Sequence, residues 1–472
     1  MGRQREAGVG VTFMALSLAV AVAVAVIWVI YRRPQRGLLL AAALVPFHGL
    51  LLIVPQGQSF VYWKDGLLAV TLLAAVMTAR RQKLGGISLP WWPIAVVFGI
   101  VGVISALVTL GVPGALYPIK ITFFYMAVIP LICWYAPLSP RDRDNLVTII
   151  MAVSVITSVW GIVQQFLGAA ALQNMGYEYN TAIRFSGAFM RSFSTFVQPF
   201  PFGLFVMMAV LVGGAVALQN PRRLRNQLFL LTIPIQLVGM GMSIVRAAYL
   251  GVIVGVLWLA IHRYRHLFVG VVLAAVAGAV ALLYVPTRYV DSLFSSSSLG
   301  QRTLGWSQIG DSVMTDPFGQ GLGATGSAAE RVETQTKNMS IDYLAMLGKL
   351  NPALQYQPDN YYVKMLLELG PIGLWAFGTL LVAVLVSALR AARYTLGADS
   401  AFCLGVSASI VAACVASLVS TYFEIFPMDF YFWLLISAVG CAVVQRSNGT
   451  DLWDADLPAD GAPVTGGRVS MT

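Results

Sequence analysis

Charged side chains are scarce in this sequence. Only 11% of its 472 residues are Asp, Glu, Lys or Arg, whereas a soluble globular chain carries about 25%. Hydrophobic residues make up 58% of the chain, and the mean hydropathy is +0.77. The apolar residues form repeated runs of roughly 17 to 25, long enough to cross a hydrocarbon core of about 30 Å. A soluble fold is therefore excluded, and we expect an all-α polytopic membrane protein.

Cysteine and histidine are also rare. The chain has four cysteines in or beside apolar runs, and they form no CxxC or Cys/His metal spacing. This predicts neither a disulfide nor a zinc site, but small buried side chains. The cysteines are Cys133, Cys403, Cys414 and Cys441, and the only histidines are His48, His262 and His266.

Thirteen apolar runs are candidate membrane spans. The first is followed by Arg32 and Arg33 and lacks a clear cleavage site, so we interpret it as a retained span. The spans are expected at 11–31, 38–54, 60–79, 91–110, 117–136, 144–168, 196–218, 227–243, 246–261, 267–285, 361–389, 398–421 and 426–445.

The short connections between these runs predict the topology. Six basic connections all fall on one side, which the positive-inside rule assigns to the cytoplasm. They are 32–36, 80–83, 141–143, 222–225, 263–265 and 390–393. The net charge of +10 reflects this pattern, so it does not indicate nucleic-acid binding. The loop 169–195 and the polar interval 286–360 are then external. The N-terminus is external too, although Arg3 and Arg5 mildly oppose this side.

Four parts of the chain differ in composition. We expect membrane helices over 1–285, a large external loop over 286–360, membrane helices over 361–446 and a disordered cytoplasmic tail over 447–472. Inside the large loop, Leu304, Ile309 and Val313 have near-helical spacing, which predicts an amphipathic helix on the membrane face. The following DPFGQGLG predicts a turn with tight backbone, but it lacks the context of a nucleotide-binding motif.

Several cations lie on the predicted outer side, against the charge rule. Buried cations near a membrane face require partners, and acids on this side are few: Asp65 beside Lys64, and Glu424 and Asp429 in a late connection. An external anion is one complement, because the planar fork of Arg suits phosphate. Headgroup contacts or ordinary ion pairs are the alternative. These cations are Arg184, Arg191, Arg246, Arg288, Arg302, Lys64 and Lys120.

The end of the large loop carries a second candidate. In QPDNYYVKMLLELG, either Asp359 or Asn360 is placed to cap the helix that follows. Alternatively, Asp359 stands at the border of water and membrane as a general base for a hydroxyl group.

An ordered set of motifs carries a family resemblance. The motifs are KDGLLAV at Lys64, RSFSTFVQPFPFG at 191–203, SIVRAAYLG around Arg246, QRTLGWSQIGDSVMTDPFGQGLG at 301–323 and PDNYYVKMLLELGPIG at 358–373. In order and spacing, over roughly residues 60–445, the chain resembles the O-antigen ligase/polymerase (Wzy-like) family. The resemblance implies a GT-C-like glycosyltransferase of the bacterial inner membrane, with the large loop in the periplasm; the apolar runs of the chain themselves give about 12–13 spans. It also implies undecaprenyl-diphosphate-linked glycans as donor and acceptor, and a chain-length regulator or export complex as partners.

The resemblance further implies residue roles. Arg191, Arg246 and, less directly, Arg184 and Arg302 would hold the donor diphosphate. Ligases of this family place His before the Asn at the loop end, where this chain has Asp359. We therefore expect a polymerase of O-antigen or exopolysaccharide units, with Asp359 and Arg302 as catalytic residues and without a metal or other cofactor. Weaker candidates for the base are Glu424 and Asp429, and candidate sugar or acceptor contacts are Asn360, Tyr361, Trp306 and Glu424, with Tyr343 and Tyr362 as further aromatic residues.

Three alternatives stay open. A ligase would transfer the finished glycan to a separate acceptor. A flippase or transporter would line a central path with charges in both halves of the membrane, whereas here the unpaired charges gather on the outer side. A non-catalytic scaffold of an export complex would tolerate the loss of Arg191 or Arg246.

Overall fold

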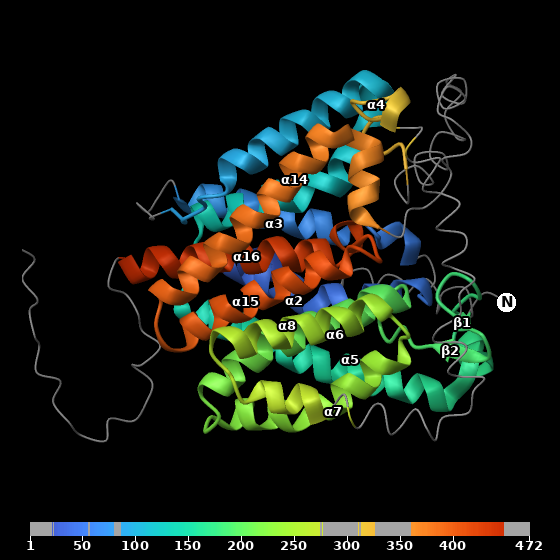
Figure 1. Ribbon diagram of the computed structural model, residues 1–472, viewed down its shortest axis with the longest axis vertical. Coiled ribbons are helices and arrows are strands. Elements are labelled where there is room, and N and C mark those ends of the chain that lie inside the picture. Colours follow the sequence, from blue (N-terminus) through green and yellow to red (C-terminus); the bar gives the residue numbers. More distant parts are fainter. Residues whose placement is uncertain are drawn as a thin grey trace, which may run out of the picture.

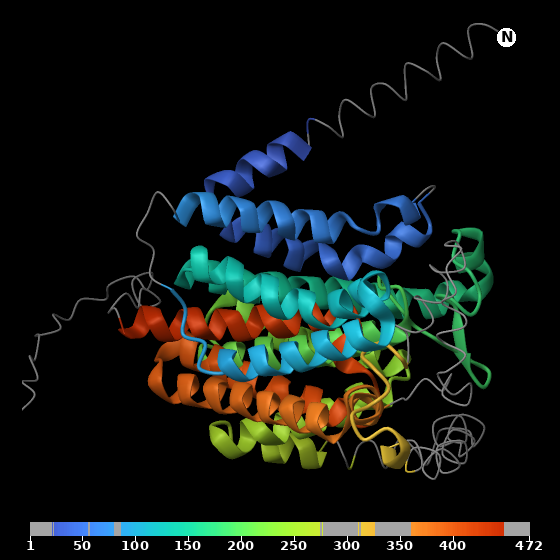
Figure 2. The same cartoon turned by 90° about the horizontal axis from the view of Figure 1, so that it is seen from above.

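A computed structural model describes residues 21, 23–54, 57–79, 86–273, 276, 310, 313–325 and 360–447. Over these residues the chain is a bundle of long helices that run side by side (Figures 1 and 2), which confirms the expected all-α membrane fold. Within the described part, the strands are confined to one small antiparallel hairpin.

The elements follow one another with short connections. An apolar helix, Ala23–Arg32, precedes them. They are α2 (Gln35–Leu44), η1 (Val45–Leu52), η2 (Gly57–Phe60), α3 (Trp63–Ala79), α4 (Trp92–Tyr135), α5 (Pro140–Asn174), β1 (Arg184–Ser186), β2 (Phe189–Arg191), α6 (Pro199–Gln219), α7 (Leu224–Met242), α8 (Arg246–His262), α14 (Tyr361–Tyr394), α15 (Gly397–Ala416), η4 (Tyr422–Glu424) and α16 (Met428–Ser447).

The described spans differ in part from the thirteen predicted. Eight helical stretches here are long and apolar enough to cross a membrane, and Ala23–Arg32 and α8 are shorter apolar helices. The run at 38–54 changes from α-helix to 3-10 helix at Val45, beside Pro46, which lacks a backbone donor. The predicted spans 91–110 and 117–136 correspond to two of these stretches, Trp92–Val112 and Gly114–Tyr135, which meet at a kink within α4 where Gly111 has a φ of +65°. Most of the predicted span 267–285 lies outside the described residues.

The core centres on α6. Nearly every residue from Pro199 to Ala217 is buried, because α6 packs against α5, α7, α8 and α15. Close approach requires small residues at these contacts. A Cβ at Gly251 of α8 would collide with Met207, and one at Gly405 of α15 would press on the α6 backbone. This central helix begins a few residues after β2, so the packing of the bundle fixes the position of the hairpin.

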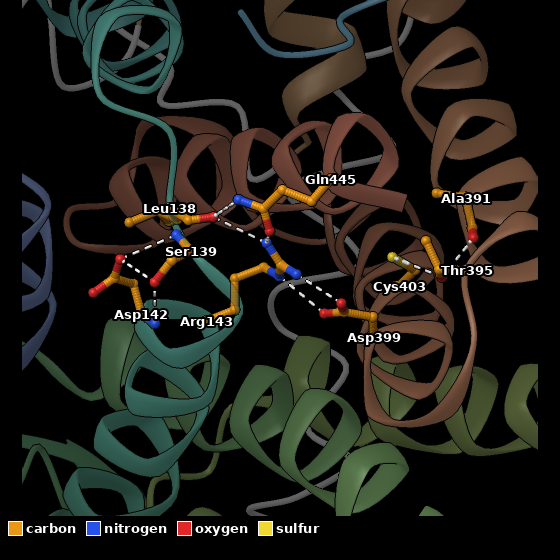
Figure 3. A network of polar contacts seen from close by, with 9 residues as sticks. All are labelled: Leu138, Ser139, Asp142, Arg143, Ala391, Thr395, Asp399, Cys403 and Gln445. Atoms are coloured by element: carbon orange, nitrogen blue, oxygen red, sulfur yellow. Dashed lines mark hydrogen bonds and ion pairs between the residues drawn. The ribbon is translucent and has the colours of Figure 1, made fainter. Parts of the chain in front are cut away.

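One end of the bundle, here called the basic end, gathers the basic connections. Arg143 of α5 is fully buried there and donates to both carboxylate oxygens of Asp399 of α15, at 2.6 and 2.9 Å (Figure 3). Arg143 also donates to the carbonyl of Leu138 and to Gln445 of α16. A single guanidinium therefore ties three helices together at this end.

Neighbouring contacts bring three further basic connections to the same end. Gln35 donates to the carbonyl of Pro137, and Arg263 donates to Ser400 at 2.6 Å. Arg223 and Arg225 both pair with Asp144, one residue after Arg143. The predicted gathering of connections 32–36, 141–143, 222–225 and 263–265 on one side is thus present, while 80–83 lies outside the described residues.

The opposite end, here called the hairpin end, carries β1, β2 and the described loop segment 313–325 (Figure 2). The helices α6, α8, α14 and α16 all begin at this end. Most of the predicted amphipathic helix of the large loop, including Leu304 and Ile309, lies outside the described residues, as does the tail after Ser447.

Candidate functional site

Three of the arginines singled out in the sequence come together at the hairpin end. The hairpin register places Arg184 of β1 opposite Arg191 of β2. Arg191 donates through Nε to the carbonyl of Ser243 at 3.1 Å, and Arg246 follows three residues later as the first residue of α8. The backbone N–H of Ser192 donates to Met242, which fixes the hairpin to the end of α7. We call Arg184, Arg191 and Arg246 the arginine cluster.

The arginine cluster concentrates positive charge at a site that is partly buried from solvent. Burial and the neighbouring charges of Arg184 and Arg246 lower the pKa of Arg191 to about 10. Its guanidinium lies 4.7 Å from the centre of the Phe200 ring. Within the described residues, no carboxylate forms a salt bridge with Arg191 or Arg246. Mutual repulsion and burial both disfavour this arrangement, so a bound anion would stabilise it.

The start of α8 adds to the positive electrostatic potential of the arginine cluster. Its N-cap residue, Val245, offers no side-chain cap, and the preceding Ile244 has a φ of +51°. The first N–H groups of a helix have no intrahelical acceptor, and the helix dipole favours negative charge there. With Arg191 and Arg246 beside it, this helix start has the parts of a phosphate site.

Two amide side chains on α5, the buried Gln164 and the part-buried Gln165, hold the segment that carries Arg191. Gln164 accepts from the backbone N–H of Ser194 at 2.8 Å and donates to its carbonyl at 2.9 Å. Gln165 donates to the carbonyl of Met190 and to the hydroxyl of Ser192. Sequence reasoning missed both residues, although two adjacent amides inside the apolar run 144–168 were a visible signal.

A second polar group lies inside the hairpin end. Lys364 of α14 is fully buried and pairs with Glu368, one helical turn on, and with Glu424 of η4, both at 2.8 Å. The side chain of Glu424, predicted as a candidate acceptor contact, is only 2% exposed. Lys364 and Glu368 were not singled out in the sequence. Charges at i and i+4 inside an otherwise apolar span were the available signal.

The buried Glu368 holds the described segment of the large loop, residues 313–325. Glu368 accepts from both the N–H and the hydroxyl of Thr325, at 3.1 and 3.0 Å. The N–H of Gly321 donates to the carbonyl of Glu368 at 2.9 Å. Gly319 and Gly321 have φ of +82° and +105°, and a Cβ at either would collide with α14 or with Thr109 of α4. The glycines of DPFGQGLG therefore serve for close backbone docking beside the α14 kink at Gly370.

Two of the predicted sugar or acceptor contacts, Asn360 and Tyr361, lie at the start of α14. Asn360 caps the helix, because its side chain accepts from the N–H groups of Tyr362 and Val363. Tyr361, predicted as a candidate sugar contact, is 1% exposed and packs against Phe377 and Phe423. The other predicted residues of the large loop, namely Arg288, Arg302, Trp306, Tyr343 and Asp359, lie outside the described residues.

The remaining charges that were predicted on the outer side form a third group on α3, α4 and α16. Asp65 pairs with Lys120 of α4 rather than with its neighbour Lys64. The ammonium of Lys64 lies 3.7 Å from the centre of the Phe426 ring. Asp429, at the start of α16, is 6% exposed, and its carboxylate accepts from the N–H of Phe430.

The helix η1 connects this third group to the arginine cluster. Thr195, four residues after Arg191, donates to the carbonyl of Pro46 at 2.8 Å. The ring of His48 lies 5.2 Å from that of Phe426. Both groups therefore border η1 at the hairpin end.

No metal site is evident among the residues that the structure describes, since no three His, Cys, Asp or Glu side chains group closely enough to hold an ion. All four cysteines are free thiols.

Comparison with known families bears on the part of the chain that contains α7, α8 and the start of α14. Residues 227–378 match the family model described as O-antigen ligase. Comparison with curated proteins gives no match. The matched residues include Arg246, the segment 313–325 and the buried Lys364 and Glu368. This match confirms the family resemblance carried by the motifs, over the third of the chain that residues 227–378 make up.

Proposed function

We propose that this protein is a glycosyltransferase that polymerises undecaprenyl-diphosphate-linked repeat units at the periplasmic face of the bacterial inner membrane. The observation that carries the proposal is the arginine cluster at the start of α8. Arg191 and Arg246 have no carboxylate partner among the described residues, and both lie beside a helix start without a side-chain cap. This arrangement suits a ligand that carries two phosphates.

The chemistry uses the cluster to stabilise the leaving group. The bond between the anomeric carbon of the donor sugar and the phosphate oxygen breaks, and its electron pair stays on the departing undecaprenyl diphosphate. The acceptor hydroxyl oxygen forms the new bond to that carbon. Fixed cations in a dry site stabilise the charge that develops on the phosphate, and loss of one such donor costs about 100- to 1,000-fold in rate.

A carboxylate must take the proton of the acceptor hydroxyl. We assign this role to Asp359 because the next residue in the sequence, Asn360, caps α14 at the hairpin end, where the arginine cluster lies. Arg302 is the further proposed catalytic residue. Glu424 is engaged by Lys364 and buried, which favours Asp359 over Glu424.

Polymerisation by purified protein in lipid tests this proposal. Wild type, given the lipid-linked repeat unit with EDTA present, should give a ladder of products on a gel. Arg246→Ala should lose the ladder. Arg222→Ala removes an exposed arginine at the basic end and is the matched control, expected to keep it. A ladder of wild-type intensity from Arg246→Ala would refute the diphosphate site, and loss of the ladder with EDTA would refute metal independence.

A ligase is the second candidate, because the family model that matches is described as O-antigen ligase. A ligase would move preassembled glycan onto a separate acceptor and give no ladder from repeat units alone. Supplying the protein with lipid-linked polymer and a core-type glycolipid acceptor separates the two activities. Movement of the intact lipid-linked unit across a vesicle bilayer, without new bonds, would instead establish a transporter.

A further inference from the structure

A cavity lies at the basic end, far along the helices from the arginine cluster. It has a volume of about 320 Å³ and lies between the segment before α4, the last turns of α14 and the end of α16. The helices α4, α14 and α16 pack against one another (Figure 1). Its walls are largely apolar and include Trp91, Val384 and Val443. None of the chemistry proposed above uses this space.

The backbone before α4 forms one wall of the cavity. The N–H of Ser88 donates to the carbonyl of Gly440 at 3.2 Å, so this segment crosses directly over α16. A Cβ at Gly440 would press on the Ser88 carbonyl, and glycine is therefore required for the crossing. The wall lies against two long helices and is held by a backbone hydrogen bond.

The mouth of the cavity is cationic and polar. Arg390 is exposed and Tyr394 is 50% exposed, and both belong to the lining, so the cavity reaches the surface beside them. Deeper along the same face of α14, the lining continues with Ser387 and Val384. One elongated site thus offers an arginine and a phenol at its opening and apolar side chains inside.

We propose that this cavity binds an anionic phospholipid of the cytoplasmic leaflet, with an acyl chain inside and the headgroup phosphate at Arg390. The walls of an apolar cavity offer water no hydrogen-bond partners, whereas burial of a hydrocarbon chain there is favourable. Basic pockets between transmembrane helices on the cytoplasmic side suit anionic headgroups. The charge of Arg390 selects an anionic headgroup over a zwitterionic one.

Lipid retention on the purified full-length protein, followed by native mass spectrometry, tests the proposal. Phosphatidylglycerol and phosphatidylcholine with identical chains are added in turn. Wild type should retain phosphatidylglycerol in preference. Arg390→Ala should weaken that retention by about fivefold, the effect of about 1 kcal/mol for one arginine near a headgroup. Arg393→Ala removes an exposed arginine of the same helix that does not line the cavity, and it should retain the lipid as wild type does.

A second variant tests the cavity itself. Ser387→Phe places a ring into the lined space and should reduce retention of both lipids, while the melting temperature without added lipid shows that the variant is folded. Equal retention of the two lipids by wild type would overturn the proposal. So would equal effects of Arg390→Ala and Arg393→Ala.

Discussion

The buried pair of Arg143 and Asp399 gives the most quantitative prediction for stability. Arg143 is 0% exposed and Asp399 2% exposed, and two hydrogen bonds join them. Asp399→Ala would leave a buried guanidinium without its carboxylate. Breaking a buried pair in this way costs about 3–5 kcal/mol, because the remaining charge stays desolvated.

A surface pair in the same protein supplies the control. Arg223 is 46% exposed in its pair with Asp144, so Arg223→Ala should cost about 0.2–1 kcal/mol. Replacing both buried partners, as in Arg143→Met with Asp399→Leu, removes both charges and should recover much of the loss.

The assay is unfolding of purified protein in a fixed detergent, compared across wild type, the single variants and the double variant. The double variant should be more stable than Asp399→Ala. Equal small losses for Asp399→Ala and Arg223→Ala would refute the view that Arg143 joins α5, α15 and α16 as a buried charge.

Three further predictions concern the hairpin end. Burial and neighbouring arginines lower the pKa of Arg191 to about 10, so its side chain is fully charged at neutral pH and loses its charge as the pH rises through 10. The affinity of wild type for diphosphate, measured by calorimetry, should therefore fall over that pH range. The affinity of Arg191→Met should fall less. Gly321→Ala should reduce polymer synthesis and lower the melting temperature, since its φ is +105° and the new Cβ would meet Thr109; unchanged melting would contradict the docking of the glycine segment. Lys364→Met should lower the free energy of unfolding by about 3–5 kcal/mol, because Glu368 and Glu424 would lose their buried cation. Adding Glu368→Gln should restore part of this loss if Lys364 and Glu368 act as one unit.

The sequence predicted the membrane class and the gathering of Arg184, Arg191 and Arg246, because hydropathy and basic connections assign each loop to a side of the membrane. It did not predict the pairing of Arg184 with Arg191, since strands of three residues have no detectable alternation. The change to a 3-10 helix at Val45 was hidden by an unbroken apolar run. Spacing along one helix also cannot show that Lys364 meets Glu424, a partner 60 residues away that only the fold brings close.

The most direct measurement is the affinity of purified protein for undecaprenyl diphosphate, with Arg191→Ala, Arg246→Ala and the control Arg222→Ala beside wild type. If the arginine cluster holds the diphosphate, each of the first two variants should lose about ten- to one-hundredfold in affinity, as expected for charge-assisted hydrogen bonds of about 1.5–3 kcal/mol. Arg222→Ala should bind as wild type does. Wild-type affinity in both Arg191→Ala and Arg246→Ala would contradict the assignment of the donor site to the start of α8.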